Sequence, residues 1–192
     1  VLDKRERMVL EKFLFQDNDL KKTGILISLF MGLRLGEVCA LKKKNVLREE
    51  QILCVRSTMQ RIQDPSMPAG QRTKVIITSP KSRSAVRDIP IPEFLLERFQ
   101  AIDGMPEEAY ILTGSEEKFI EPRTLENIFK RCLKKCAMPE VNYHTLRHTF
   151  ATRCIEAGID AKSLSEILGH ASVNITLNQY VHSSMEQKRE NM

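Results

Sequence analysis

Apolar residues near the start of the chain recur at every third or fourth position, which is the period of an amphipathic helix. The first such segment covers about residues 5–14 and follows Asp3, a residue type that caps helices. A second segment, from about Leu20 to Met31, is apolar almost all round, so we expect a buried helix there. A short third helix is predicted around Val38, just after two closely spaced glycines.

In the middle of the chain the pattern changes to short runs rich in β-branched residues, which are typical of strands. The predicted strands of a small antiparallel sheet are Ile52–Met59, Lys74–Thr78 and Ser84–Ile91. The residues of 79–83 favour a turn between the last two strands, and the prolines and glycine of 64–70 indicate a loop.

The helical period returns after Pro92, and further helices are predicted over about 94–99 and from Pro122 onward. Three helices close the chain, at about His144–Ala157, Ala161–Leu168 and Asn174–Val181. Glycines that follow the first two of these helices end them. We therefore expect an α+β fold, mainly α-helical, with helices packed around a small three-stranded antiparallel sheet.

The chain has 192 residues, of which 42% are apolar, and neither a repeat nor a linker divides it, so one domain is expected. Its longest apolar stretch, 25–41, is interrupted by polar residues and is shorter than the roughly 20 residues of a membrane span. Five scattered cysteines without a preceding signal peptide indicate a reduced, cytoplasmic setting. Cys132 and Cys136 are interpreted as small buried side chains, because no second pair of zinc ligands lies nearby.

The net charge of +5 and the isoelectric point of about 9.0 fit a polyanionic partner and an ordinary solvated surface equally well. Basic residues concentrate between Lys42 and Arg98, whereas acidic residues gather between Glu107 and Glu126. This segregation makes a basic face plausible, although charge alone does not distinguish it from a solvated surface.

Arg147 occupies a position where the pattern of its helix requires an apolar residue, since it heads the column that continues with Ala151 and Ile155. A lone arginine in such a position ordinarily pairs with a buried carboxylate. Arg147 also lies in the first turn of its helix, where backbone N–H groups and the helix dipole attract phosphate. His144 lies on the same side, three residues earlier. The His144–His148 pair lacks the glutamate of a zinc protease motif, so zinc is not favoured.

Arg34 likewise interrupts an apolar run, and it lies between Gly32 and Gly36, which permit a close backbone approach. Glu37 offers the simple alternative of a local ion pair. Two arginines at core-like positions, far apart in the sequence, nevertheless suggest a clamp, because guanidinium groups suit the oxygens of a phosphodiester.

Two polar residues near the end of the chain complete the set of candidates. His170 follows a helix-ending glycine, in a turn that presents side chains. Tyr180 lies beside the apolar Leu177 and Val181, so half-burial of its ring is an adequate structural explanation for a tyrosine at this position. A tyrosine with an ordinary pKa of about 10 acts as a nucleophile only where cations and hydrogen bonds favour its phenolate.

Four strings, in this order, resemble the tyrosine recombinase (phage integrase) family, and specifically its C-terminal catalytic domain. They are Gly32-Leu33-Arg34-Leu35-Gly36-Glu37, His144-Thr145-Leu146-Arg147-His148, Leu168-Gly169-His170, and Tyr180 ten residues after His170. The likeness covers nearly the whole chain. It implies the fold of that catalytic domain and the activity of a site-specific DNA recombinase or integrase, of the kind that mobile genetic elements encode.

The resemblance implies roles for the phosphate-binding residues and for the nucleophile. Arg34 and Arg147 would hold the nonbridging oxygens of the scissile phosphate, and His170 would bond a phosphate oxygen. Tyr180 would attack in line, which gives a 3′-phosphotyrosyl intermediate and a free 5′-hydroxyl. His144 would assist as a proton acceptor or hydrogen-bond partner. The strand would then be joined to a new 5′-hydroxyl without metal, cofactor or ATP.

Two more residues receive roles from the same resemblance. Lys81, in the predicted turn, matches the lysine that protonates the leaving 5′-oxygen, although Lys74 and Arg83 lie close by. Glu37 matches a residue that orients the groups of the active site.

The resemblance further implies the partners and the domain organisation. Double-stranded DNA at a specific site, other recombinase protomers in a tetrameric synapse, and accessory directionality or bending proteins are expected. The free protein is expected to be a monomer. We expect it in the cytoplasm, associated with the nucleoid when it is active, and we expect no membrane partner. Residues 1–182 correspond to the catalytic domain and 183–192 to a polar tail, whereas the N-terminal DNA-clamping (core-binding) domain is absent from this chain. Because Val1 is not an initiator, we expect a fragment of a longer protein.

Two other functions share some of these features. A type IB topoisomerase uses similar chemistry to relax supercoiled DNA. A non-enzymatic helix-turn-helix regulator would explain the alternation of helices and glycine turns between Thr149 and Tyr180 in a basic chain. The regulator leaves Arg34 and Tyr180 without a role, and the compact chain fits a recombinase better than a topoisomerase.

Overall fold

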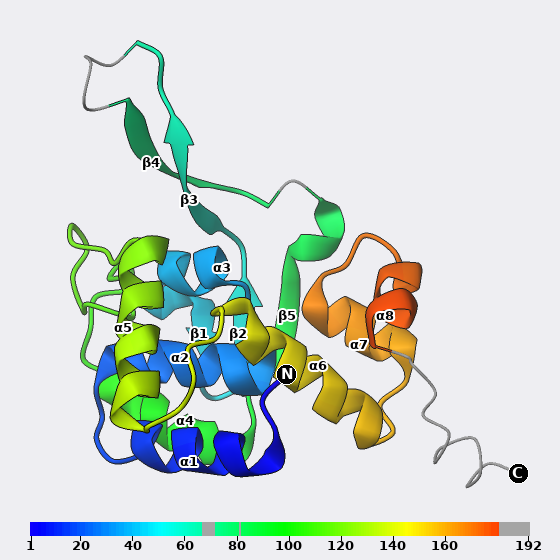
Figure 1. Cartoon of the computed structure of the whole chain (residues 1–192). Coiled ribbons are helices and arrows are strands. Elements are labelled where there is room, and N and C mark those ends of the chain that lie inside the picture. The colour runs from blue at the N-terminus through cyan, green and yellow to red at the C-terminus, as the bar shows by residue number, and fades with distance from the viewer. Residues whose placement is uncertain (67–71, 81, 181–192) are drawn as a thin grey trace, which may run out of the picture.

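The computed structural model describes residues 1–66, 72–80 and 82–180 (Figure 1). Its α-helices are α1 (Lys4–Leu14), α2 (Leu20–Met31), α3 (Leu35–Ala40), α4 (Glu93–Phe99), α5 (Pro122–Lys135), α6 (His144–Glu156), α7 (Ala161–Leu168) and α8 (Val173–Tyr180). Its strands are β1 (Val46–Leu47), β2 (Ile52–Val55), β3 (Thr58–Gln63), β4 (Thr73–Thr78) and β5 (Arg87–Pro90). Short 3₁₀ helices are η1 (Lys43–Asn45), η2 (Arg83–Ala85) and η3 (Gln100–Ile102).

Local capping sets the ends of the first helices. The carboxylate of Asp3 accepts a hydrogen bond from the backbone N–H of Glu6 at 2.8 Å, and the Glu6 carboxylate accepts one from the backbone N–H of Asp3 at 2.9 Å. These reciprocal bonds satisfy N–H groups that a helix start leaves unpaired. At α2 the carboxylate of Asp19 accepts a single capping hydrogen bond, from the backbone N–H of Lys21 at 2.7 Å, and Gly32 ends that helix in the left-handed conformation with a φ of 69°.

Helix α2 is the centre of the core, as its apolar pattern predicts. It contacts α1, α3, α5 and α6, and its residues 25–29 are completely buried. The one polar side chain among them, Ser28, forms a hydrogen bond of 3.0 Å with the hydroxyl of Tyr143. The Tyr143 ring meets Phe129 of α5 edge to face, with ring centroids 5.3 Å apart. Phe129, Tyr143 and the apolar residues of α2 belong to the main core, and a second, smaller cluster of buried residues joins α6 and α7.

The strands differ from the predicted arrangement. The predicted strand Ile52–Met59 is two strands, β2 and β3, because the chain leaves the first sheet after Val55. The three-stranded antiparallel sheet has the order β1-β2-β5, in which Leu53 faces Ile89, and β3 pairs with β4 in a separate two-stranded sheet. The pattern did not reveal β1, because two residues are too short for an alternation to show.

The β3–β4 hairpin projects away from the helices, and its base lies against α3 (Figure 1). This contact depends on Gly36, because a Cβ atom there would overlap the backbone carbonyl oxygen of Met59. Gly36 therefore brings the base of the hairpin close to Arg34, which precedes α3.

The expected fold class is confirmed, since helices surround a small antiparallel sheet. All the cysteines are free thiols, and every one except the half-buried Cys136 is buried. Within the described ranges, no helix has the length and apolar character needed to cross a membrane.

Candidate active site

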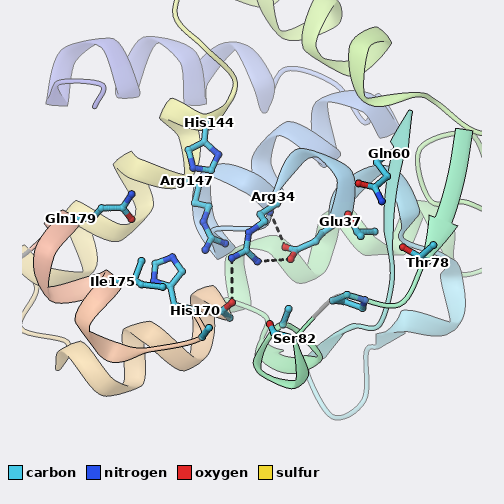
Figure 2. A pocket seen from close by; sticks show the side chains of 15 residues that line it. Arg34, Glu37, Gln60, Thr78, Ser82, His144, Arg147, His170, Ile175 and Gln179 are labelled. Carbon is cyan, nitrogen blue, oxygen red and sulfur yellow. Dashed lines mark hydrogen bonds and ion pairs between the residues drawn. The ribbon is translucent and has the colours of Figure 1, made fainter. Parts of the chain in front are cut away.

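A pocket of about 570 Å³ lies between helices α6–α8 and the elements α3, β3, β4 and η2. Predicted site residues from distant parts of the sequence meet in its wall (Figure 2). The lining residues with polar side chains are Arg34, Glu37, Thr58, Gln60, Thr78, Ser82, His144, Arg147, His170 and Gln179. The fold therefore gathers the predicted Arg34, Glu37, His144, Arg147 and His170 around one cavity.

Backbone carbonyl groups hold Arg147 in the wall of the pocket. Its side chain projects from the first turn of α6 and is only 2% exposed. The guanidinium donates hydrogen bonds to the carbonyl oxygens of Gly32, at 2.6 Å, and Leu168, at 2.8 Å. These two acceptors lie where α2 and α7 end, so the position of the charge is set by the junction of three helices.

Arg34 also lines the pocket (Figure 2). Its guanidinium donates to Glu37 Oε1 at 2.8 Å and to the carbonyl oxygen of Gly169 at 3.2 Å. The Arg34 side chain keeps 37% of its surface exposed. The two interpretations of the sequence are therefore compatible, since Arg34 pairs with Glu37 and also lines the cavity.

Arg87 is a residue of this network that the sequence interpretation missed. Its buried guanidinium forms a bidentate ion pair with Glu37, with N–O distances of 3.1 and 2.9 Å. It also donates to the carbonyl oxygens of Ile167, at 2.6 Å, and Ala85, at 2.9 Å. The sequence of β5 contained a signal of this burial, because alternate residues of a strand face the same side and Arg87 shares the inward face with Ile89.

Glu37 stays ionised although it is only 2% exposed. Burial alone would raise the pKa of this carboxyl, but the hydrogen bonds and charges of Arg87 and Arg34 outweigh burial and hold the pKa below its ordinary value. One buried carboxylate thus pairs with two guanidinium groups and fixes the orientation of the one that faces the pocket.

Replacing Glu37 by alanine should destabilise the fold by about 3–5 kcal/mol, because the buried Arg87 guanidinium would lose its counter-charge. Urea unfolding followed by circular dichroism measures the loss. Glu126→Ala is the matched control, since it breaks an exposed pair with Arg123 and should cost less than about 1 kcal/mol. Similar losses in the two variants would contradict a structural role for the buried ion pair.

Two histidines complete the polar wall. The His144 ring lies edge to face against His148, with ring centroids 4.8 Å apart. His170 follows the left-handed Gly169, and its Nδ1 atom lies 2.8 Å from the hydroxyl of Thr176. The described residues contain no group of three or more His, Cys, Asp or Glu side chains that could hold a metal ion.

Both pocket histidines are neutral near pH 7. Burial, followed by the charges of Arg147, Arg34 and Arg87, lowers the pKa of His170 to about 4. Burial, followed by His148, Arg147 and Arg34, also lowers the pKa of His144. Each ring therefore retains one N–H donor and one lone pair at neutral pH.

The low pKa of His170 predicts a pH dependence of stability. In the unfolded chain this group binds a proton near its ordinary pKa of 6.5, whereas the folded chain resists protonation down to about pH 4. Stability supplied by the neutral ring is complete above pH 6.5 and is lost as the pH falls toward 4. The unfolding free energy of the wild type minus that of His170→Asn should thus fall over this range, and a constant difference would contradict the pKa shift.

Two predicted site residues lie wholly or partly outside the described residues. Lys81 lies outside the described residues, and its neighbours Pro80 and Ser82 line the pocket. Tyr180 ends α8, and its side chain lies outside the described part of the chain. Gln179, immediately before it, lines the pocket. The backbone thus brings α8 to the cavity.

Comparison with known proteins identifies the chain's relatives. The model of the phage integrase family matches residues 16–187, a span that includes every predicted site residue. The chain is 27% identical over 209 residues to a tyrosine recombinase XerC-like protein of Caldanaerobacter subterraneus subsp. tengcongensis, covering 95% of this chain and 54% of that protein. It is 30% identical over 164 residues to the tyrosine recombinase XerA of Thermococcus onnurineus, covering 81% of this chain and 50% of that protein.

A solved structure gives the same relationship. The integrase of transposon Tn1549, in complex with a circular intermediate DNA, matches this structure with a TM-score of 0.77 at 26% identity, covering 100% of this chain and 64% of that one. The chain spans about half the length of the two recombinases it matches. The family model covers most of the residues, and the fold agrees with that of the integrase. This chain therefore belongs to the phage integrase family.

Proposed function

We propose that the pocket binds the scissile phosphate of a DNA strand and that the chain is the catalytic domain of a site-specific recombinase. The observation that carries this proposal is the convergence of Arg34, Arg147 and two neutral histidines on one cavity beside α8, the helix that ends at Tyr180. Arginines suit this task because their N–H groups match phosphate oxygens.

The two arginines would stabilise the transition state electrostatically. In-line attack on a phosphodiester places extra negative charge on the nonbridging oxygens, and preorganised donors are most effective where charge develops. Arg147 is fixed by carbonyl groups and Arg34 by Glu37 and Gly169, so neither has to reorganise during the reaction. His170 would donate its N–H to another phosphate oxygen.

Tyr180 would supply the nucleophile. Its phenolic oxygen bonds to phosphorus, the bond from phosphorus to the 5′-oxygen breaks, and a 3′-phosphotyrosyl link remains. The tyrosine proton passes to neutral His144, and Lys81 protonates the leaving 5′-oxygen. Because the bond energy is kept in the link, a 5′-hydroxyl of another strand can reverse these steps without ATP and complete the exchange.

The expected partners follow from this reaction. Strand exchange requires double-stranded DNA with a specific site and further protomers in a tetrameric synapse, with accessory proteins setting the direction. The Tn1549 integrase, which binds a circular intermediate DNA, supports DNA as the substrate. Residues 183–192, proposed as a tail that packs on a neighbouring protomer, lie outside the described residues. A catalytic domain over 1–182, and action at the nucleoid, also remain proposals.

A pool of nicked duplexes with randomised sequence around the nick tests the proposal. The nick lets the short cleaved strand diffuse away, so a covalent adduct accumulates. At low salt, which favours binding to phosphates, the chain should form an adduct that survives detergent and chelator. Sequencing of the trapped DNA should give a common site. Duplex binding without any adduct would favour the regulator, and relaxation of plasmid without strand transfer would favour the topoisomerase.

A further inference from the structure

Thr176 is not among the residues that line the pocket, but it contacts one of the pocket's histidines. Its side chain is 0% exposed, and its hydroxyl oxygen lies 2.8 Å from Nδ1 of His170. The two residues belong to different segments, since His170 follows α7 and Thr176 is in α8. The bond therefore joins the histidine of the pocket to the helix that ends at Tyr180.

The hydrogen bond has two possible directions, with different chemical consequences. Either the hydroxyl donates to Nδ1, which leaves the proton of a neutral imidazole on Nε2, or an Nδ1–H group donates to the hydroxyl. In the described part of the chain, Nδ1 of His170 is the one hydrogen-bond partner found for this hydroxyl. A buried hydroxyl proton without an acceptor costs about 1–3 kcal/mol. The first direction satisfies that proton, whereas the second does not.

We propose that Thr176 is a positioning residue that donates its hydroxyl proton to Nδ1 of His170 and so holds the imidazole in the tautomer that carries its proton on Nε2. The Nε2–H group is then the donor that His170 offers to a bound phosphate. This inference rests on the proposed function, because the tautomer matters for catalysis only if the pocket binds a phosphate.

The charge state of His170 explains why a positioning residue is needed. A protonated imidazole carries N–H groups on both nitrogens and would donate to phosphate in any case. Burial and the nearby Arg147, Arg34 and Arg87 lower the pKa of His170 to about 4, so the ring is neutral at pH 7. A neutral ring has one N–H group, and the partner of the other nitrogen decides where it is.

The first experiment measures the tautomer in the free protein. The full chain is labelled with ¹⁵N in its 4 histidines, and long-range ¹H–¹⁵N correlation spectra are recorded at pH 7.5. His170→Asn assigns the His170 signals. We expect a protonated Nε2 in the wild type and in Thr176→Ser, and a mixture of tautomers in Thr176→Val, which has the same shape without the hydroxyl. A protonated Nδ1 in the wild type, or an unchanged tautomer in Thr176→Val, would overturn the proposal.

Inorganic phosphate provides a readout that needs no DNA. Titration should shift the Nε2–H signal of His170 in the wild type and in Thr176→Ser, and should shift it less in Thr176→Val. An equal shift in all three proteins would contradict the link between the tautomer and phosphate binding.

The third experiment measures adduct formation in a single turnover on the nicked duplex selected from the pool. Thr176→Val should be about 10–100-fold slower, the usual effect of removing a group that orients an active-site ligand, while Thr176→Ser should stay near the wild-type rate. In a His170→Asn background, Thr176→Val should have no further effect, because there is no imidazole to orient. An equal slowing in that background would show that the hydroxyl acts on the fold, and would overturn the proposal.

The tautomer and the adduct distinguish failure of the inference from failure of the proposed function. If the wild type forms no adduct on any duplex but shows the expected tautomer and phosphate shift, the recombinase function is wrong and the role of Thr176 stands. If the adduct forms and the tautomer is the opposite one, the recombinase function stands and the role of Thr176 is wrong.

Discussion

Tyr180→Phe should abolish the covalent adduct between this chain and a nicked duplex, with a fall in rate of roughly 10⁴-fold or more. Phenylalanine keeps the ring but removes the oxygen that we propose bonds to phosphorus, so no covalent intermediate should form. The measurement is the fraction of DNA that migrates with the protein in a denaturing gel after incubation with chelator.

The other tyrosines are the matched controls. Tyr143 is buried, its hydroxyl is bonded to Ser28, and burial raises its pKa, so it is unsuited to attack. Tyr110 is buried beside Phe119 and is not among the residues that line the pocket. Tyr143→Phe and Tyr110→Phe should therefore still form the adduct. An adduct that persists in Tyr180→Phe would refute Tyr180 as the nucleophile, and peptide mapping would then identify the true one.

Arg147→Lys should slow adduct formation by about 100–1,000-fold, the usual effect of losing one preorganised donor to a developing negative charge. Lysine keeps the charge but lacks the rigid fork of a guanidinium. It cannot reproduce the hydrogen bonds to Gly32 and Leu168 while it also faces a phosphate. Single-turnover kinetics measure the rate, and urea unfolding separates it from a loss of stability.

Arg153→Lys on the same helix is the control for this change. Arg153 lies 3.9 Å from Glu11 and over the ring of Phe30, away from the pocket. Its replacement should leave the rate of adduct formation close to that of the wild type. If Arg147→Lys cleaved as fast as Arg153→Lys, a charge alone at that position would be sufficient, and the role of the preorganised guanidinium donors of Arg147 would be refuted.

The helices were predictable because their signals are local. The carboxylates of Asp3 and Asp19 cap α1 and α2 through hydrogen bonds to residues within a single turn. The apolar surface of α2 specified its burial before any packing partner was known. Gly169 ends α7 with a φ of 66°, a conformation that glycine adopts without steric cost. Signals of this kind depend on neighbours in the sequence.

The strand pairing was less predictable, because it depends on contacts between distant residues. The run Ile52–Met59 looks continuous, yet its first half pairs with β5 and its second half with β4. The division follows from where the chain meets other elements, including the contact of β3 with Gly36. A propensity for strand formation does not contain that information.

By itself, the sequence determined the helical framework and identified Arg34, Glu37, His144, Arg147 and His170 as candidates, because charged residues in apolar patterns and family strings are visible without coordinates. Only the tertiary structure decided that these side chains surround one cavity, and only it revealed the contacts of Arg87 with Glu37 and of Thr176 with His170. The physical reason is the range of the interactions. A cap or a periodic face acts within a few residues, whereas Arg87 reaches Glu37 across 50 positions and Arg147 reaches Gly32 across 115.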